Sequence, residues 1–320
     1  MYNSLITIPS IWTLKSLIAQ FIVKYIQRKY NLGSQYKQSF SMSHDVDWKK
    51  IKHYAELSKL AYTDHKETIN DHFKDQVGST VYINEIKSVR YILITNDDEK
   101  THTIIVRGTN NIKNAFQNLK YDKDWSKRLQ CNLHSGFHRV AGRIYADLSR
   151  LLNPQYTINL TGHSLGGAEA VIIAAYCKHD DLLVNEIVTF GQPKIFDRDG
   201  IKKWSNLPLT RVINETDIVP LMPPVELIYM FKRYRHFGEM IKLCNDEYYC
   251  FLEKHQASGM GVNSFWLNIS KENLSLINVS SELGDHSYNG YIENINPKLS
   301  GGKELLWKDR ERYLDDLKEM

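Results

Sequence analysis

What is scarce in this sequence excludes several classes of protein. Only four of the 320 residues are cysteine, and no two of them form the C-x-x-C pair that is typical of zinc sites and dithiol redox sites. Proline and glycine number 8 and 17, so the chain is neither collagen-like nor a Pro/Gly-rich low-complexity polymer. The 42% of hydrophobic residues indicates a globular protein and not a disordered one.

Long hydrophobic runs and a strong charge imbalance are also absent. No stretch reaches the about eighteen uninterrupted apolar residues of a membrane-spanning helix. The chain has 41 basic and 37 acidic side chains, a net charge of +4, and no long basic cluster, so we expect no nucleic-acid partner. Cys244 and Cys250 lie close enough in sequence to form a disulfide in an oxidising compartment; the reduced state is favoured, and the choice stays open.

The first 45 residues differ in pattern from the rest of the chain. Polar positions recur every three or four residues from Ser10 to Tyr30, which predicts an amphipathic helix, and residues 31–45 are polar enough to form a linker. No Lys or Arg precedes Lys15, which argues against a cleaved signal peptide, and no compartment is predicted. Two interpretations stay open, namely that the helix packs on the main domain or that residues 10–30 attach to a membrane surface.

Residues 46–300 alternate between apolar strands and amphipathic helices. We expect helices at 46–62, 138–152 and 165–178, and strands at 91–95, 102–108, 156–160, 186–190 and 209–213. This alternation predicts crossover connections and an α/β domain with a mainly parallel central sheet flanked by helices. Residues 301–320 are highly charged and predict a solvated helix at the surface, starting at Lys303.

One segment of the main domain carries a specific chemical signal. Gly162-His163-Ser164-Leu165-Gly166-Gly167 follows an apolar strand and runs directly into a helix, which is the required context of a G-x-S-x-G nucleophile elbow. The glycines remove side chains that would collide in so sharp a turn. We therefore predict that Ser164 presents its hydroxyl as a nucleophile.

A serine hydroxyl needs a base, and in this architecture the partners follow in the order Ser, acid, His. Asp217 lies just past the strand at 209–213, on the rim where ligands collect in open α/β sheets. Of the later histidines, His179 precedes this acid and is expected to be a solvated helix cap, while His236 and His255 are expected at the surface. His286, in a loop after Gly284, is the remaining candidate for the base.

Further motifs in the same order resemble those of the class 3 (fungal-type) lipases, a family of α/β-hydrolases. The resemblance covers about residues 50–292, and its motifs are Ala55-Glu56-Leu57 through Ala61-Tyr62, Val106-Arg107-Gly108-Thr109, His134-Ser135-Gly136-Phe137, Gly162 to Gly167, Phe190-Gly191-Gln192-Pro193-Lys194, Asn214 to Pro220, and Asp285-His286-Ser287 with Tyr288 and Tyr291. It implies an α/β-hydrolase fold and a catalytic triad of Ser164, His286 and Asp217. It implies neither a metal nor an organic cofactor.

The oxyanion hole of an elbow enzyme uses the backbone N–H of the residue after the nucleophile, here Leu165, and a second donor from an earlier strand end. The resemblance assigns the second role to Thr109; the alternative is a turn or cap residue. The resemblance also makes His163 a packing residue and not a base, and we expect Arg107 to brace the loop by charge-assisted hydrogen bonds.

The spacing of His134 and His138 could suggest a metal site, but no acidic residue lies between them and His134 already fits the lipase pattern, so we predict no metal.

Two segments bear on substrate access. Residues 110–120 form one apolar helical face after Thr109, which in similar lipases is a lid that opens at a lipid surface; an ordinary surface helix has the same pattern. Residues 219–231 are apolar and either line an acyl pocket or belong to the core.

Together these features predict a serine carboxylester hydrolase that releases fatty acids from acylglycerols at a lipid–water interface through an acyl-enzyme. The alternatives are a phospholipase A1 or lysophospholipase on the same scaffold, and a catalytically silent lipid-binding protein. For the hydrolase, the rate should rise with pH as the base loses its proton.

Overall fold

A computed structural model describes residues 44–74, 78–109, 122–222, 234–254, 257 and 286–307. They belong to a compact unit that begins at His44, close to the expected boundary at residue 46. The expected helix at 10–30, the candidate lid at 110–120, residues 223–231, His255 and residues 308–320 lie outside the described residues. Within the described ranges, no helix has the length and hydrophobicity needed to cross a membrane.

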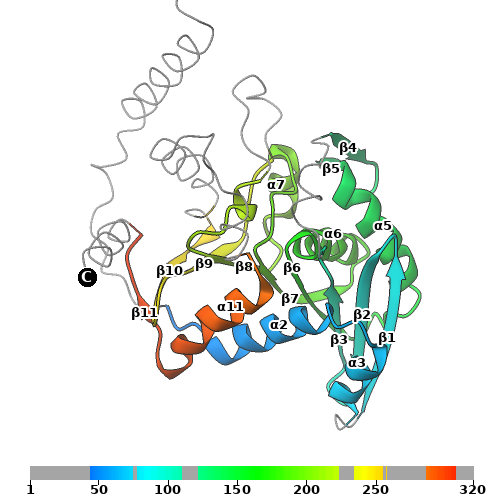
Figure 1. Cartoon of the computed structure of the whole chain (residues 1–320). Helices are drawn as coiled ribbons and strands as arrows, with labels where there is room; N and C mark the ends of the chain where they lie inside the picture. The colour runs from blue at the N-terminus through cyan, green and yellow to red at the C-terminus, as the bar shows by residue number, and fades with distance from the viewer. Residues whose placement is uncertain are drawn as a thin grey trace, which may run out of the picture. The chain divides into compact units, whose positions relative to one another are not determined.

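A twisted sheet runs through the unit, with strands in the order β1-β2-β3-β6-β7-β8-β9-β10-β11 (Figure 1). The pairs β3–β6, β6–β7, β7–β8 and β8–β9 are parallel, and β1–β2, β2–β3 and β9–β10 are antiparallel. The strands are β1 (Ser79–Ile86), β2 (Val89–Asn96), β3 (Thr101–Val106), β6 (Thr157–His163), β7 (Leu183–Phe190), β8 (Leu209–Asn214), β9 (Glu239–Leu243), β10 (Tyr248–Leu252) and β11 (Lys303–Glu304). The mainly parallel centre confirms the predicted α/β fold.

Helices cover both faces of the sheet. One face carries α5 and α6, and the other carries α2 and α11, which lie side by side (Figure 1). The helical elements are α2 (Trp48–Leu60), α3 (Lys66–Phe73), α5 (Ser135–Leu148), α6 (Leu165–His179), α7 (Arg198–Trp204), η1 (Val219–Leu221), α11 (Tyr288–Ile295) and η3 (Asn296–Ser300). A separate hairpin joins β4 (Lys123–Ser126) to β5 (Cys131–His134).

The alternation of side chains along the strands explains the two cores. In β2, Tyr91 and Leu93 pack into the core on the α5 and α6 face, while Ile92 and Ile94 pack into the core on the α2 and α11 face. Successive side chains of a strand point to opposite faces, so a strand covered on both sides is apolar throughout. Each fully buried aliphatic or aromatic side chain contributes about 1.5–3 kcal/mol.

The central helix α6 is buried along most of its length, from Gly166 to Cys177. A helix that is buried on all sides needs small or apolar residues all round, and its run of Ala, Val and Ile supplies them. Cys177 is a core residue, as expected, and all four cysteines are buried free thiols.

The chain after residue 300 differs from the expectation. Lys303–Glu304 form β11, which pairs in parallel with β10, so the predicted helix does not begin at Lys303. Backbone bonds from Lys303 N to Glu247 O (2.8 Å) and from Leu305 N to Tyr249 O (2.7 Å) hold this segment on the sheet edge. Tertiary hydrogen bonds at the edge therefore outweigh the local preference for a helix.

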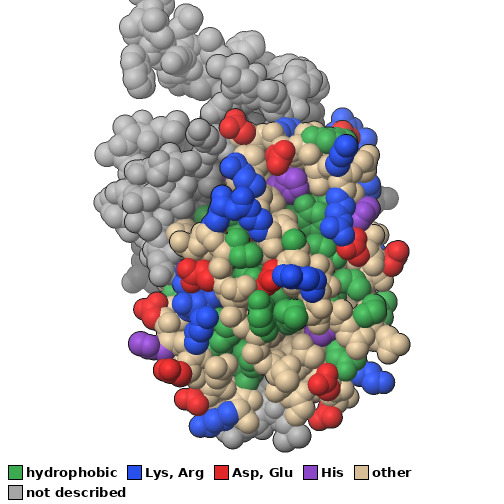
Figure 2. Space-filling view, turned by 90° about the vertical axis from the view of Figure 1, so that its right-hand side faces the viewer, with side chains coloured by type: hydrophobic (Ala, Val, Ile, Leu, Met, Phe, Trp, Pro, Cys, Tyr) green, Lys and Arg blue, Asp and Glu red, His purple; other side chains and the backbone are tan. Residues whose placement is uncertain are grey.

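The surface seen in Figure 2 mixes side chains of both charges with hydrophobic ones. Neither basic nor acidic side chains dominate that face, in line with the small net charge of the sequence.

Candidate active site

The predicted nucleophile lies in a strained turn between β6 and α6. Ser164 has φ 59° and ψ −130°, a conformation that a non-glycine residue adopts at a cost of about 1–3 kcal/mol and that clusters at functional sites. Its backbone N–H donates to Phe190 O at 2.8 Å. A Cβ at Gly166 would lie 2.2 Å from Val106 O, so only glycine permits this close approach of α6 to β3.

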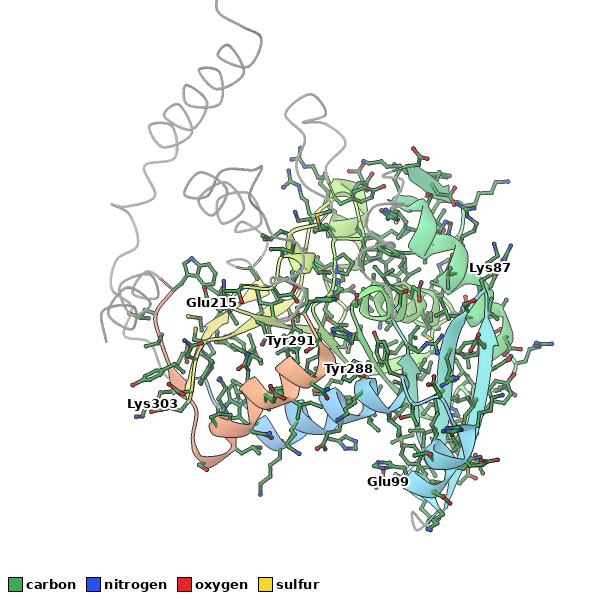
Figure 3. The ribbon with its side chains drawn as sticks, in the orientation of Figure 1. Lys87, Glu99, Glu215, Tyr288, Tyr291 and Lys303 are labelled. Atoms are coloured by element: carbon green, nitrogen blue, oxygen red, sulfur yellow. The ribbon has the colours of Figure 1, made fainter. Side chains whose placement is uncertain are left out.

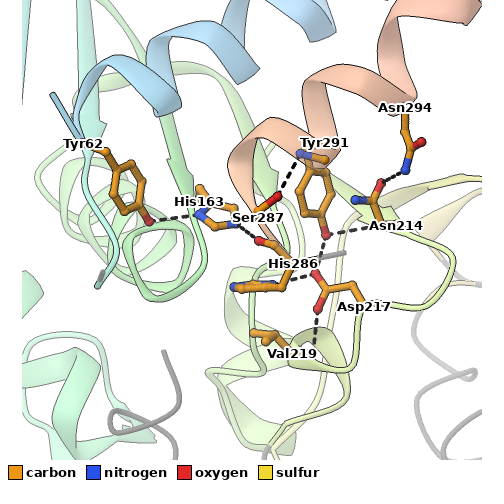
Figure 4. Close-up of polar contacts among 10 residues, drawn as sticks. Tyr62, His163, Asn214, Asp217, Val219, His286, Ser287, Tyr291 and Asn294 are labelled. Carbon is orange, nitrogen blue, oxygen red and sulfur yellow. Dashed lines mark hydrogen bonds and ion pairs between the residues drawn. The ribbon is translucent and has the colours of Figure 1, made fainter. Parts of the chain in front are cut away.

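The predicted acid and base are in direct contact (Figure 4). His286 Nδ1 donates to Asp217 Oδ2 at 2.7 Å, and both side chains are fully buried. Asp217 Oδ2 also accepts from Tyr291 at 2.5 Å, and Oδ1 accepts from the Val219 N–H at 2.8 Å. These donors compensate the cost of burying a carboxylate, and a proton on Nδ1 leaves Nε2 of a neutral His286 as the acceptor.

The carboxyl end of β7 brings the three predicted residues together. Phe190 O binds the backbone of Ser164, and the next residue, Gly191, lies against both His286 and Asp217. A Cβ on Gly191 would lie 2.7 Å from His286 Cε1 and 2.8 Å from Asp217 Oδ2, and its φ is +59°. Within the described part of the chain, Ser164 Oγ and His286 Nε2 are buried and have no hydrogen-bond partner, so nothing described competes for either atom.

The sequence motifs did not reveal the role of Tyr291. Its hydroxyl also accepts from the Asn214 N–H at 3.2 Å, and Asn294 donates to the Asn214 side chain at 3.1 Å. Ser287 caps α11 by accepting from Gly290 N at 3.0 Å, and the helix carries Tyr291 toward the sheet (Figure 3). Tyr291 belongs to a quoted motif, but the direction of its hydroxyl depends on how α11 docks.

His163 does more than pack beside the nucleophile. Its Nε2–H donates to the His286 backbone carbonyl at 2.6 Å, and its Nδ1 accepts from the Tyr62 hydroxyl at 2.9 Å (Figure 4). Burial, and next the proximity of His286, lower the pKa of His163 well below its ordinary value. A neutral His163 therefore fixes the backbone of the base without placing a charge beside it.

The candidate oxyanion residues lie next to the elbow. Leu165 is the first residue of α6. Thr109 follows β3 and Gly108, at which a Cβ would lie 3.1 Å from Ser164 Cβ, so the backbone here runs against the nucleophile. Arg107 donates to Ser88 O at 2.6 Å and lies 3.9 Å from Glu85, which ties this strand end to the β1–β2 turn.

The prediction for His236 is wrong. It is 8% exposed and donates through Nε2 to Pro220 O at 2.6 Å, because its ring lies against the turn that follows Asp217. His179 is exposed at the end of α6, as expected.

His138 bonds Asp124 Oδ2 at 2.7 Å and the Tyr176 hydroxyl at 2.8 Å, so both of its ring nitrogens are engaged. His134 is buried, and burial lowers its pKa to about 4. Among the described residues no group of three or more His, Cys, Asp or Glu side chains has the geometry to hold a metal ion.

One buried acid was not anticipated from the sequence. Glu169 lies on α6, five residues after the nucleophile, and is 3% exposed. Its Oε2 has no hydrogen-bond partner among the described residues, and burial raises the pKa of this carboxyl well above its ordinary range.

This chain is similar to known lipases in sequence and in fold. Residues 103–227 match the model of the class 3 lipases. The chain is 31% identical over 145 residues to the secreted mono- and diacylglycerol lipase 1 of Fusarium solani, covering 42% of this chain and 43% of that protein. It is 30% identical over 156 residues to a lipase of Rhizomucor miehei, covering 45% of this chain and 42% of that protein.

The fold is also similar to that of lipase II from Rhizopus niveus. The TM-score is 0.53 at 20% sequence identity, with 66% of this chain and 88% of the other covered. In sequence, the chain spans less than half the length of the curated relatives just described. The segment 103–227, which holds Ser164 and Asp217, is thus similar to the class 3 lipases, and the fold of the chain is similar to that of a fungal lipase.

Proposed function

We propose that this protein is a serine carboxylester hydrolase that releases fatty acids from acylglycerols. The observation that carries the proposal is the buried His286–Asp217 pair, with a 2.7 Å hydrogen bond, beside a serine at φ 59° in a nucleophile elbow. Strained nucleophile turns and buried acid–base pairs are features that folding alone does not favour. Their occurrence together supports acyl transfer.

In the proposed reaction, Ser164 Oγ attacks the ester carbonyl carbon while His286 Nε2 takes the hydroxyl proton. The carbonyl oxygen becomes an oxyanion, which the backbone N–H groups of Leu165 and Thr109 stabilise. His286 then gives its proton to the leaving alcohol, and an acyl-enzyme remains. Water, deprotonated by the same imidazole, then attacks the acyl carbon. The bond between this carbon and Ser164 Oγ breaks, the imidazolium returns the proton to Oγ, and the fatty acid leaves.

Asp217 does not take the proton in this scheme. Its charge stabilises the imidazolium that forms at His286, and its hydrogen bond keeps Nε2 directed at the serine. Val219 N–H and Tyr291 hold the carboxylate from two further directions. All of these steps use side chains and backbone groups of the chain itself, and a lipid surface supplies the substrate.

The names of the relatives favour acylglycerols among the esters. The Fusarium solani relative is called a mono- and diacylglycerol lipase, and the fungal fold relative is a lipase. Head-group choice depends on loops and not on the triad, so phosphatidylcholine is the informative second substrate.

The test is fatty acid release from a triacylglycerol emulsion, a diacylglycerol emulsion and phosphatidylcholine vesicles. Ser164→Ala, checked by its thermal melt, is the blank. The proposal expects serine-dependent release from an acylglycerol, at a higher rate than from phosphatidylcholine. Faster release from phosphatidylcholine would replace it by a phospholipase, and no release above the blank from folded protein would support a silent lipid-binding protein.

A further inference from the structure

The turn after Asp217 is held by an unusual set of donors. Three consecutive backbone carbonyls each accept a hydrogen bond: Pro220 O from His236 Nε2 at 2.6 Å, Leu221 O from Lys194 Nζ at 2.5 Å, and Met222 O from the Lys194 backbone N–H at 2.8 Å. Lys194 follows β7 and His236 precedes β9. Two segments far apart in sequence therefore converge on one short turn.

This turn holds one oxygen of the Asp217 carboxylate. Val219, the first residue of η1, donates its N–H to Asp217 Oδ1 at 2.8 Å. Leu221 N and Met222 N close the turn on Ile218 O and Val219 O, both at 3.0 Å. A shift of the carbonyls of the turn would move the Val219 N–H and with it Asp217 Oδ1, and so would rotate the Oδ2 that accepts from His286.

We call the donors of Lys194 and His236 to the carbonyls of residues 220–222 the clamp. Burying these side chains is costly in electrostatic terms. Lys194 and Arg211 are 3% and 2% exposed, and burial lowers their pKa to about 8 and about 9. Burial, and then the charges of Arg211 and Lys194, keep the pKa of His236 well below its ordinary value, so its Nε2 carries the proton that Pro220 O accepts. Arg211 Nε in turn donates to Phe237 O at 2.8 Å, beside His236.

Buried cations are weak contributors to stability, since their desolvation offsets most of their attractive interactions. The buried carbonyls of the turn need donors, but neutral side-chain amides would supply them at a smaller desolvation cost than a lysine does. The Lys194 ammonium, the neutral His236 imidazole and the Lys194 backbone N–H together give the three carbonyls defined positions. A catalytic group displaced by about 1 Å can lose about 100-fold in rate.

We infer that Lys194 and His236 are positioning residues that act through Asp217, holding the turn of residues 218–222 so that the carboxylate stays on His286 Nδ1. The inference rests on the proposed hydrolase activity. It requires that loss of the clamp lowers kcat and leaves KM nearly unchanged, since neither side chain has to contact substrate for this effect.

A double-mutant cycle separates this role from a merely structural one. The variants are Lys194→Met, Lys194→Arg and His236→Leu, each made in the wild-type chain and in Asp217→Ala. Lys298→Met is the matched control, because Lys298 is another buried lysine that donates to three carbonyls, those of Cys244, Asp246 and Asn294, none of which contacts the candidate triad. A soluble p-nitrophenyl ester is the substrate, and each variant is assayed below its melting temperature.

We expect Lys194→Met to lower kcat about 10- to 100-fold in the wild-type chain and less than about twofold in Asp217→Ala, where no carboxylate remains to be positioned. Lys194→Arg, which keeps a donor, should recover most of kcat. Lys298→Met should lower the melting temperature and leave kcat within about twofold.

An equal loss of kcat in both backgrounds, or a folded Lys194→Met with unchanged kcat, would overturn the inference. Should Lys194→Met fail to fold, His236→Leu serves instead, because it removes the donor to Pro220 O. Its kcat must fall in the wild-type chain and stay unchanged in Asp217→Ala; any other result overturns the inference. Failure of the proposed function is a different result, in which wild type and Ser164→Ala release product at the same rate.

Discussion

Replacing the buried acid of α6 should stabilise the protein. Glu169 is 3% exposed, and its Oε2 has no hydrogen-bond partner among the described residues. A buried unsatisfied polar group costs about 1–3 kcal/mol, and leucine has a similar volume and a favourable helix propensity. We therefore expect Glu169→Leu to raise the free energy of unfolding by about 1–3 kcal/mol, which corresponds to about 2–4 °C in Tm per kcal/mol in a domain of this size.

The stability difference between Glu169→Leu and wild type should grow with pH. Burial raises the pKa of Glu169 in the folded state, so the folded protein holds a proton that the unfolded chain loses above about pH 4.3. Below that pH the Glu169 carboxyl is protonated in both the folded and the unfolded state, so its titration does not lower the free energy of unfolding. Between that pH and the folded pKa, wild type loses up to about 1.4 kcal/mol per pH unit relative to Glu169→Leu, and above the folded pKa the difference is constant.

Thermal melts followed by circular dichroism at pH 5 and pH 8 test this prediction. Glu99→Leu is the surface control, because Glu99 is exposed in the β2–β3 turn (Figure 3), and its effect should stay within about 0.5 kcal/mol without a pH trend. Glu169→Gln should remove the pH trend without the full gain. A Glu169→Leu variant that is less stable than wild type, or a difference that shrinks from pH 5 to pH 8, would refute the reasoning.

Three further substitutions test the site. Asp217→Asn should lower kcat by up to about 10⁴-fold with KM retained, because an amide favours the wrong tautomer of His286; steady-state kinetics on a p-nitrophenyl ester with kcat within tenfold of wild type would contradict it. Tyr291→Phe removes the 2.5 Å bond to Asp217 and should cost about 1.5–3 kcal/mol in unfolding free energy, measured by denaturant titration; an unchanged midpoint would count against that bond. Gly191→Ala places a Cβ 2.7–2.8 Å from His286 and Asp217 and should lower both Tm and kcat, whereas wild-type values would mean that the backbone there moves freely.

Much of the fold follows from local sequence patterns. Five strands and one helix are each apolar over the length of a typical strand or helix: β2, β3, β6, β7, β8 and α6. The alternation of strands and helices predicts the parallel centre of the sheet. The glycines around Ser164 predict the sharp turn, because the chain there cannot carry larger side chains. The placement of Asp217 just past β8 follows from where parallel strands end.

What the sequence could not predict depends on contacts between distant segments. His236 is buried because distant residues pack against it, among them Pro220, whose carbonyl accepts from its Nε2 at 2.6 Å, and no local pattern near His236 records that. The Tyr291 hydroxyl meets Asp217 across 74 positions of sequence, and β11 pairs with β10 although Lys303–Glu304 are residues that local preference assigns to a helix. Glu169 is a charged residue, for which the sequence predicts exposure to solvent. Only the packing of α6 shows that it is buried.

The most direct test of the central claim is reaction with a p-nitrophenyl phosphonate ester, followed by intact-protein and peptide mass spectrometry. Such a reagent bonds to a serine oxygen only when a base activates it. The account predicts one phosphonyl group on Ser164 in wild type, none in Ser164→Ala, and a strongly slowed reaction in a folded His286→Ala. Labelling of Ser164→Ala at the wild-type rate, or no labelling of folded wild type, would contradict the claim that the His286–Asp217 pair activates Ser164.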